Sequence, residues 1–432
     1  MDDWQPTRAL RRAVGLVCLL LIAAVTVGRP DLAVLAIPFV VGTLWALRRR
    51  PDGLPEVAMR VDETQVGEGL DVSAAVSVDN PGPAEFQPVV IASQASRWLP
   101  PRGDGRPVAT VIPAGLGADL ELGMTAIRWG RHRLGPVRVQ ATACDGLLHS
   151  QIVGVPPVEI RVHPLTEHFD ADDAMPRAAG LSGAHRSRRP GEGGELVGVR
   201  HFAPGDRLRR IDWRVSLRTR ELHVAATLSD RDADVVLVLD TLHEAGESGG
   251  VRGRSSVLDI AVRGAAGVAE HYLRRGDRVS LLEFGPRHRQ LRSAGGRWHY
   301  RAVREWLLDT HVIAGLLDVG TWLSRPHQLP TNAVIVIFTP LLDERSAELL
   351  ARLARSGRFV IAVDTLPAHA RPEIDSVWLA AATRLWLLSR QNTIGELAEH
   401  GVPTVTWRGA GSLDEVLRDI SRMAGAARAV PR

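Results

Sequence analysis

Two apolar runs near the N-terminus constrain the fold of this chain more than any other feature. They cover residues 13–27 and 32–47, and the short turn Gly28-Arg29-Pro30-Asp31 separates them. Each run is slightly shorter than the roughly 20 residues that cross a bilayer, but flanking side chains can make up the difference. The pattern predicts a two-helix transmembrane hairpin over residues 1–50.

Arginines gather outside this hairpin and are scarce in its turn. Those outside it are Arg8, Arg11, Arg12, Arg48, Arg49 and Arg50. The positive-inside rule places such a side in the cytoplasm. We therefore expect a two-pass protein of the cell membrane with the bulk of the chain cytoplasmic. A secretory signal peptide is the alternative, but Val25-Thr26-Val27 is a poor cleavage sequence and a second apolar run follows at once.

The composition excludes several classes of function. Basic residues number 53 against 49 acidic ones, a small excess that gives no indication of nucleic-acid binding. Every basic residue is arginine, and a P-loop or a Schiff-base enzyme needs a lysine. The two cysteines, Cys18 and Cys144, are too few for a ligand cluster, and Cys18 lies in an apolar run.

Residues 51–165 have the pattern of an antiparallel β-sandwich of the immunoglobulin-like kind. Apolar and polar residues alternate from Leu70 to Val78, and Asn80-Pro81-Gly82 then breaks the run. Further predicted strands cover Val89–Ala92, Val108–Ile112, Leu120–Ile127, Val137–Thr142 and Val158–Val162. Short strands at this spacing favour a sandwich.

Residues 166–225 are predicted to be a linker followed by a signature segment. The first part, to residue 195, is rich in Gly, Ala, Asp and Arg. Gly191–Glu195 resembles a phosphate loop in its glycines, but it lacks the preceding strand and the lysine. We interpret it as a flexible loop.

Residues 226–432 alternate buried strands with helices, which predicts an α/β domain with a parallel sheet of the Rossmann type. Val235–Leu239 is a continuous apolar run ending at Asp240, and the next helix is capped by Ser255 or Ser256 and stopped by Gly276. The other predicted strands are Val279–Phe284, Val334–Phe338, Phe359–Val363 and Pro403–Thr406. The other predicted helices lie near His299–Leu308, from Asp343 to Gly357, near Thr393–His400, and after Ser412.

The signature segment, residues 200–218, combines two carboxylates with six arginines. Ala203-Pro204-Gly205-Asp206 has the chemistry of a tight turn. After it, Leu208, Ile211 and Val215 have helical spacing, while Ile211, Trp213, Val215 and Leu217 alternate as in a strand. Two interpretations stay open: an arginine–carboxylate lattice that holds a corner between domains, and a docking or anion-binding surface.

This segment resembles the signature of a bacterial family catalogued as domain of unknown function fifty-eight. The matching residues are Arg200, Pro204, Gly205, Asp206, Arg209, Ile211, Asp212, Trp213, Ser216 and Arg218. Two departures are Phe202, where the family usually has Tyr, and Leu217, where it usually has Ala. The resemblance implies two membrane helices, a β-rich domain and a von Willebrand A-like domain. It also implies a MoxR-type AAA+ ATPase as a partner, because the family's genes usually lie beside the gene for such an ATPase.

Asp240 is the candidate metal ligand, because ligands sit at the carboxyl ends of parallel strands. The metal site of a von Willebrand A domain begins D-x-S-x-S, and here Leu242 and Glu244 replace both serines. Pro340 stands where that fold usually has an Asp. A single carboxylate holds Mg²⁺ poorly, even with Glu244 or Asp343 to assist. We therefore expect no cofactor, with Mg²⁺ at Asp240 as the weaker alternative.

The sequence thus favours a membrane-anchored, non-enzymatic scaffold whose von Willebrand A-like domain binds protein partners, a MoxR-type ATPase first among them. One alternative is a metal-dependent adhesion module with a degenerate site. The other is an enzyme acting on cell-envelope precursors through Asp206 and Asp212. The neighbouring arginines argue against it, because they would keep both carboxylates ionised and leave no proton donor.

Overall fold

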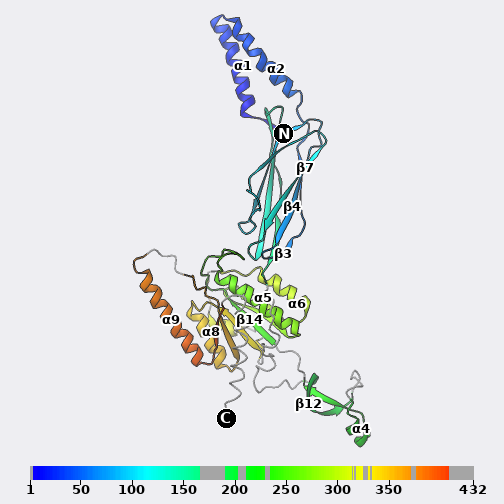
Figure 1. Ribbon diagram of the computed structural model, residues 1–432, viewed down its shortest axis with the longest axis vertical. Helices are drawn as coiled ribbons and strands as arrows, with labels where there is room; N and C mark the ends of the chain where they lie inside the picture. Colours follow the sequence, from blue (N-terminus) through cyan, green and yellow to red (C-terminus); the bar gives the residue numbers. More distant parts are fainter. Residues whose placement is uncertain are drawn as a thin grey trace. The chain divides into compact units, whose positions relative to one another are not determined.

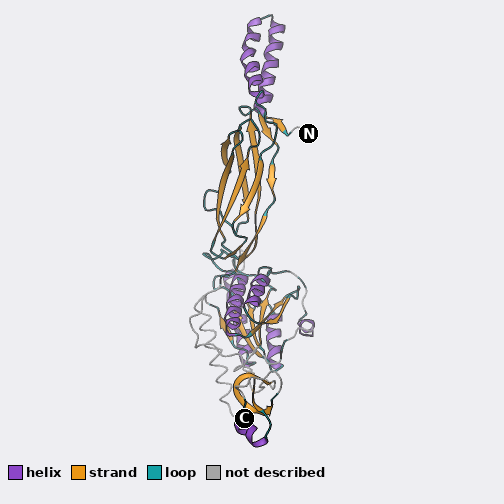
Figure 2. Cartoon of the chain, turned by 90° about the vertical axis from the view of Figure 1, so that its right-hand side faces the viewer, coloured by secondary structure: helices purple, strands orange, loops and turns teal. Residues whose placement is uncertain are grey.

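The computed structural model describes residues 3–165, 190–202, 211–228, 234–313, 315, 318–324, 329–330, 333–370 and 376–407. These residues belong to two compact units, 1–163 and 164–432. Figure 1 follows the chain through both units and Figure 2 shows their helices and strands. Each unit is described by itself.

The first unit begins with two antiparallel apolar helices, α1 (Arg8–Val27) and α2 (Pro30–Leu47). The hydroxyl of Thr7 caps α1 by accepting a hydrogen bond from the amide of Leu10, and Gly28 ends the helix at φ 68°. Both helices are long and apolar enough to cross a membrane, by length and composition. The prediction of two N-terminal apolar helices is confirmed, and their orientation stays a prediction.

The base of this hairpin is joined to the β-sheets of the same unit. Strand β1 (Trp4–Pro6), which precedes α1, pairs antiparallel with β9 (Leu148–Ser150). The indole Nε1 of Trp4 donates to the carbonyl of Gly53, beyond α2, at 3.1 Å. The hydroxyl of Thr7 donates to the carbonyl of Gly146 at 2.8 Å. The segments before and after the hairpin are therefore held together at one end of it.

The rest of the first unit consists of two sheets whose side chains share common cores. One sheet contains β1, β3 (Gln65–Gly67), β5 (Phe86–Ala95), β6 (Val108–Ile112), β8 (Gly130–Ala143), β9, β10 (Val153–Val155) and β11 (Val158–His163). The other has the order β2 (Glu56–Val61), β4 (Asp71–Asp79) and β7 (Gly117–Thr125). Val76 of β4 packs with Ile91 and Val139 of the larger sheet in one core. The predicted strands are present, and the immunoglobulin-like arrangement stays a prediction.

The second unit is built on a six-stranded sheet with the order β16-β15-β14-β17-β18-β19. The strands are β14 (Asp234–Asp240), β15 (Arg278–Phe284), β16 (Gln290–Ala294), β17 (Val334–Thr339), β18 (Phe359–Asp364) and β19 (Thr404–Thr406). All pairs are parallel except β15 with β16. Continuous burial along β14 and β17 explains why their sequences are apolar without alternation.

Helices contact both faces of this sheet. They are α5 (Val257–Arg275), α6 (Arg297–Leu307), α7 (Val319–Ser324), α8 (Glu344–Arg355) and α9 (Leu379–Glu399). On one face Val236 and Ile335 pack against Leu349 of α8. On the other face α5 approaches β17 so closely that a Cβ added to Gly264 would lie 2.7 Å from the ring of Phe338. The prediction of a mixed α/β fold is confirmed.

Two predictions of local structure are wrong. Gly191–Glu195, expected to be a flexible loop, lies in strand β12 (Pro190–His201), which pairs with β13 (His223–Leu228) with shifts of register. Helix α9 begins at Leu379 rather than near Thr393, because its first turns lack the polar stripe by which a helix is recognised. The helix predicted after Ser412 lies outside the described residues.

Candidate functional site

The best-defined cluster of polar side chains lies at the carboxyl edge of the parallel sheet, defined here as the ends of β14, β17 and β18. Those strands end in Asp240, Thr339 and Asp364. In open α/β sheets this edge is where ligands bind. Both aspartates are almost wholly buried, so the donors around them decide what they can do.

Asp240 is surrounded by hydrogen-bond donors of the protein itself. Its Oδ2 accepts from the hydroxyls of Thr339 and Ser346, both at 2.6 Å. Its Oδ1 accepts from the backbone amide of Leu242 at 3.0 Å. The residue is 1% exposed. Asp240 therefore joins the ends of two strands and the first turn of α8, which places it in a structural role.

The protonation of Asp240 reflects this environment. Burial raises the pKa of its carboxyl above the usual range, because removal from water penalises the charged form. The hydrogen bonds from Ser346, Thr339 and Leu242 act in the opposite direction, and the nearby charge of Asp343 adds to the rise. The donors lower the penalty of burial without cancelling it.

The other predicted metal ligands are engaged elsewhere. Glu244 accepts a hydrogen bond from the amide of Leu258, at the start of α5, at 3.1 Å. Asp343 caps α8 by accepting from the amide of Arg345 at 2.9 Å, and it also accepts from the Arg345 side chain and from His243 Nε2. These hydrogen bonds, led by that of the Arg345 guanidinium, hold the pKa of Asp343 well below its usual range.

The donor set at Asp240 does not fit Mg²⁺, which requires several oxygen ligands in octahedral geometry. Two hydroxyls and an amide donate hydrogen bonds to the Asp240 carboxylate. The side chains of Leu242 and Leu341, which follow the ends of β14 and β17, are buried and apolar. Within the described part of the chain, no three His, Cys, Asp or Glu side chains are grouped to hold a metal ion.

Asp364, at the end of β18, is satisfied by a cation instead. Its Oδ1 accepts from Arg390 Nη2 at 2.5 Å and from the amide of Leu366 at 2.9 Å. Arg390 Nε also donates to the carbonyl of Pro340 at 3.0 Å. Both side chains of the ion pair are largely buried. This pair fixes α9, which carries Arg390, to the carboxyl edge.

The signature segment is described only in part. Pro204, Gly205, Asp206 and Arg209 lie outside the described residues, and Arg200 pairs through its backbone with Val224 in β12 and β13. Asp212 caps helix α4 (Trp213–Thr219) by accepting from the amides of Arg214 and Val215. The segment after Asp212 is thus a helix, which settles the ambiguous periodicity.

The described half of the signature forms a corner between α4 and β13. The Ser216 hydroxyl donates to the carbonyl of His223 and accepts from its amide, at 3.3 and 2.9 Å. The amide of Asp212 donates to the same carbonyl at 2.9 Å. Trp213 and Arg218 are exposed on α4. This geometry supports a structural role for Asp212 and Ser216 and leaves Trp213 and Arg218 available for contacts.

Sequence reasoning missed the residues that complete the carboxyl edge: Thr339, Ser346, Asp364 and Arg390. The only local signal was that Thr339 and Asp364 directly follow predicted strands, at the position where functional side chains concentrate. Nothing in the sequence links Ser346 to Asp240 or Arg390 to Asp364. It also missed an exposed apolar segment at the start of α9, where Val377 is 94%, Trp378 74% and Leu385 70% exposed.

The fold and this edge define an α/β protein with a parallel sheet and a buried, hydrogen-bonded aspartate where a ligand site is expected. Residues 198–373 match the family described as protein of unknown function DUF58. The resemblance seen in the sequence is therefore confirmed over this segment. The association with von Willebrand A domains and with MoxR-type ATPases stays a prediction.

The similar curated proteins are described as uncharacterised and indicate no function for this chain. Uncharacterised proteins of Mycobacterium bovis and Mycobacterium tuberculosis are 42% identical over 60 residues, which are 14% of this chain and 19% of theirs. The chain thus spans about a fifth of the length of these relatives.

Two solved structures match short parts of the chain, each at 14% identity. A cohesin module from a Clostridium perfringens family 33 glycoside hydrolase has a TM-score of 0.19 and covers 25% of this chain and 96% of the module. A β-glucosidase from Listeria innocua has a TM-score of 0.15 and covers 26% and 17%. At these scores neither similarity bears on the fold or function of this chain.

Proposed function

We propose that this chain is a membrane-anchored, non-enzymatic scaffold whose second unit, a von Willebrand A-like α/β domain, binds a protein partner. The observation that carries the proposal is the exposed apolar surface at the start of α9, which we call the α9 surface and define as Val377, Trp378, Leu385, Leu387 and Leu388. All five side chains are exposed in the described chain. Exposed apolar side chains concentrated in one segment mark protein or membrane contacts.

The sequence of α9 supports a protein partner. From Val377 to Thr393 the only charged residues are Arg384 and Arg390, and Arg390 is used internally in the ion pair with Asp364. The apolar residues are not gathered on one stripe, as they would be in a helix made to lie on a lipid surface. A helix that is apolar on most sides is normally covered by other protein or spans a membrane, and among the described helices only α1 and α2 qualify as candidate spans.

The carboxyl edge supports a role in binding rather than catalysis. Asp240 and Asp364 are both consumed by internal hydrogen bonds, and Asp212 caps a helix. A general acid or base must instead reach a substrate proton. The enzyme alternative depends on Asp206, which lies outside the described residues, and it stays a prediction.

The resemblance to the family supplies the identity of the partner, a MoxR-type AAA+ ATPase. The predicted orientation of the hairpin supports this choice, because it leaves the second unit in the cytoplasm, where ATP is available. The absence of lysine supports it too, because a P-loop in this chain would need one. Any nucleotide-driven step would then belong to the partner.

The test is co-purification of the full chain from detergent-solubilised native membranes. We expect an AAA+ ATPase to be retained by the natural chain and lost, by at least tenfold, from the double variant Trp378→Glu/Leu385→Glu. Buried charge at a protein interface is strongly unfavourable, which is the reason for the size of the effect. The purified ATPase should likewise bind the purified natural chain more tightly than the purified double variant.

Two matched variants make the result specific. Trp298 on α6 is 80% exposed and stands away from α9 in the sequence, so Trp298→Glu should retain the ATPase. Trp213→Glu tests α4, the other candidate surface. Retention of an ATPase by the α9 variant but not by Trp213→Glu would move the docking surface to α4. If no ATPase is retained by the natural chain, the proposal is wrong.

A further inference from the structure

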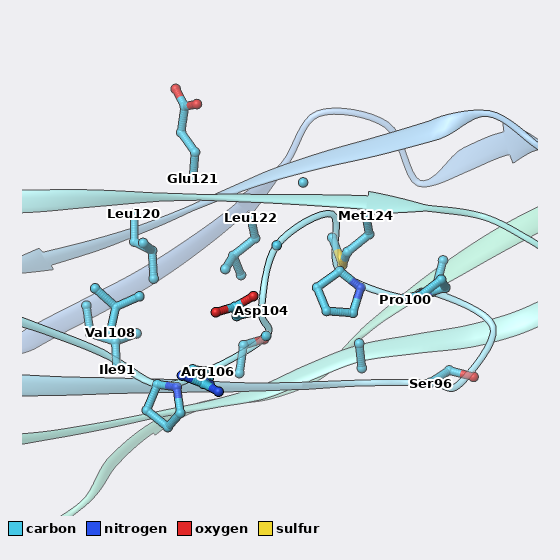
Figure 3. Close-up of a pocket in the computed structure, with 18 of the residues that line it drawn as sticks. Ile91, Ser96, Pro100, Asp104, Arg106, Val108, Leu120, Glu121, Leu122 and Met124 are labelled. Atoms are coloured by element: carbon cyan, nitrogen blue, oxygen red, sulfur yellow. The ribbon is translucent and has the colours of Figure 1, made fainter.

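The first unit contains a cavity that none of the preceding functions uses. It has a volume of about 680 Å³ and lies between β5 and β6 of one sheet and β7 of the other, beside the segment 96–108. This volume falls in the range of about 300–1,000 Å³ typical of ligand sites. Figure 3 shows Leu120 and Leu122 of β7 directed into it, with Ile91 of β5 on the opposite side.

Two of the strands that border the cavity, β6 and β7, are the last strands of their sheets. Among the named strands β7 pairs only with β4, and β6 pairs only with β5. A strand at the end of a sheet presents backbone N–H and C=O groups that can pair with an added strand. The cavity therefore lies beside backbone as well as apolar side chains.

Part of the free side of β7 is already paired. The amide of Arg102 donates to the carbonyl of Gly123 at 2.9 Å, and the amide of Thr125 donates to the carbonyl of Pro100 at 3.2 Å. Odd-numbered residues of β7 thus direct their backbone groups away from β4. By the alternation of an antiparallel ladder, the amides and carbonyls of Asp119 and Glu121 point the same way. In the described chain this pairing ends at Gly123.

The side chains of β7 define the sequence that an added strand would need. Even-numbered residues, Leu120 and Leu122, face the cavity, while Figure 3 shows Glu121 directed away from it. Asp119 and Glu121 are both exposed and acidic. On a neighbouring strand, side chains beside them are favoured when basic, and side chains over the cavity are favoured when apolar.

The other charged groups at the cavity do not reverse this preference. Arg102 is paired with Asp71, and the Arg97 guanidinium stacks over Trp98. Asp104 adds a further exposed carboxylate at the cavity, and Arg106 is an exposed cation on the opposite, β5 side. The free part of β7 is therefore acidic outside and apolar inside.

We propose that β7 accepts an extended peptide of a protein partner by strand addition along Gly117–Leu122, with apolar side chains in the cavity and basic side chains beside Asp119 and Glu121. This site is independent of the α9 surface. The occupant is a segment that alternates apolar and basic residues, recognised by backbone pairing and by side chains at every second position.

The probe is a fluorescein-labelled nine-residue peptide of alternating valine and arginine, with both ends blocked, titrated onto the full chain in detergent and followed by anisotropy. We expect saturable binding at least tenfold tighter than that of an otherwise identical valine–glutamate peptide. A peptide with the same valines and arginines in two blocks should also bind at least tenfold more weakly. Equal binding of the block peptide would reduce the effect to charge and overturn the proposal.

Hydrogen exchange separates strand addition from simple filling of the cavity. The bound peptide should slow exchange of the Asp119 and Glu121 amides and leave the Leu120 and Leu122 amides, which face β4, unchanged. An apolar molecule that only fills the cavity protects neither pair selectively. Absence of selective protection in the presence of bound peptide would overturn the proposal.

A variant tests the backbone directly. Glu121→Pro removes an amide on the free side of β7 and none that faces β4, so the sheet should tolerate it. We expect Glu121→Pro to weaken binding of the valine–arginine peptide at least tenfold. Glu121→Gln keeps the amide and should weaken this binding two- to fivefold. If the proline variant does not fold, the natural chain with a peptide N-methylated at its pairing positions gives the same test. Unchanged binding of that peptide would contradict the proposal.

Discussion

Two buried aspartates at the same edge of one sheet are satisfied in different ways. Asp240 and Asp364 each accept a hydrogen bond from the amide two residues later, at 3.0 and 2.9 Å. Beyond this, neutral hydroxyls surround Asp240, whereas the guanidinium of Arg390 faces Asp364. The two hydroxyls connect β14 to β17 and to α8, and the ion pair connects α9 to β18. Burial therefore leaves Asp240 with a raised pKa, because its hydrogen bonds do not fully offset the cost of removing its charge from water.

The largest effect should come from the ion pair. Arg390→Met leaves a buried, uncompensated carboxylate at Asp364, which is expected to lower the free energy of unfolding by about 3–5 kcal/mol. Urea unfolding of the full chain in detergent measures it. The double variant Arg390→Met/Asp364→Asn removes the stranded charge and should recover part of the loss. A cost below about 1 kcal/mol for Arg390→Met would mean that the pair is effectively solvated.

A smaller effect is expected at the neutral cluster. Ser346→Ala removes one of two hydroxyl donors to Asp240 and leaves Thr339 in place, so the expected loss of unfolding free energy is about 1–3 kcal/mol. Ser389→Ala, at an exposed position of α9, is the matched control and should stay within about 0.5 kcal/mol. If both substitutions cost the same, the hydroxyl of Ser346 does not stabilise Asp240.

The smallest effect is a difference in the pH dependence of stability. The pKa of Asp240 is raised in the folded state. Its contribution to the free energy of unfolding is therefore fully present below about pH 3.9 and is lost as the pH rises through the folded pKa. The pKa of Asp343 is lowered, so its contribution is present above about pH 3.9 and is lost as the pH falls. Each slope is at most about 1.4 kcal/mol per pH unit.

Asparagine variants isolate the two slopes. The unfolding free energy of the natural chain relative to Asp240→Asn should fall as the pH rises above about 4. Relative to Asp343→Asn it should fall as the pH drops below about 4. Urea midpoints between pH 2 and pH 7 measure both. If both differences in unfolding free energy changed with pH in the same direction, the pKa values of Asp240 and Asp343 would not be shifted in opposite directions.

Local signals in the sequence predicted much of the parallel sheet. Ser256 and Gly276 cap the two ends of α5, and Asp343 caps the start of α8, as their residue types indicate. Continuous apolar runs identified β14, β17 and β18 because strands covered on both faces have no polar side. Each of these signals depends on residues within a few positions of one another.

The candidate site could not be predicted in the same way. Asp240 receives its hydroxyl donors from residues 99 and 106 positions later in the chain, and no spacing rule covers such distances. Strand β12 was missed because Gly191, Gly193 and Gly194 have low β propensity and their pairing is irregular. The Asp212 cap was missed because helical and alternating spacing overlap in the signature.

The pairing of β1 with β9 has a consequence for biosynthesis. Trp4–Pro6 leaves the ribosome before its partner strand Leu148–Ser150, which is made more than a hundred residues later. At roughly 5–20 residues per second the first strand waits on the order of 10 s for that partner. Helices α1 and α2 are therefore complete before β1 can pair with β9, and a nascent chain stalled before Leu148 would carry the two helices without this pairing.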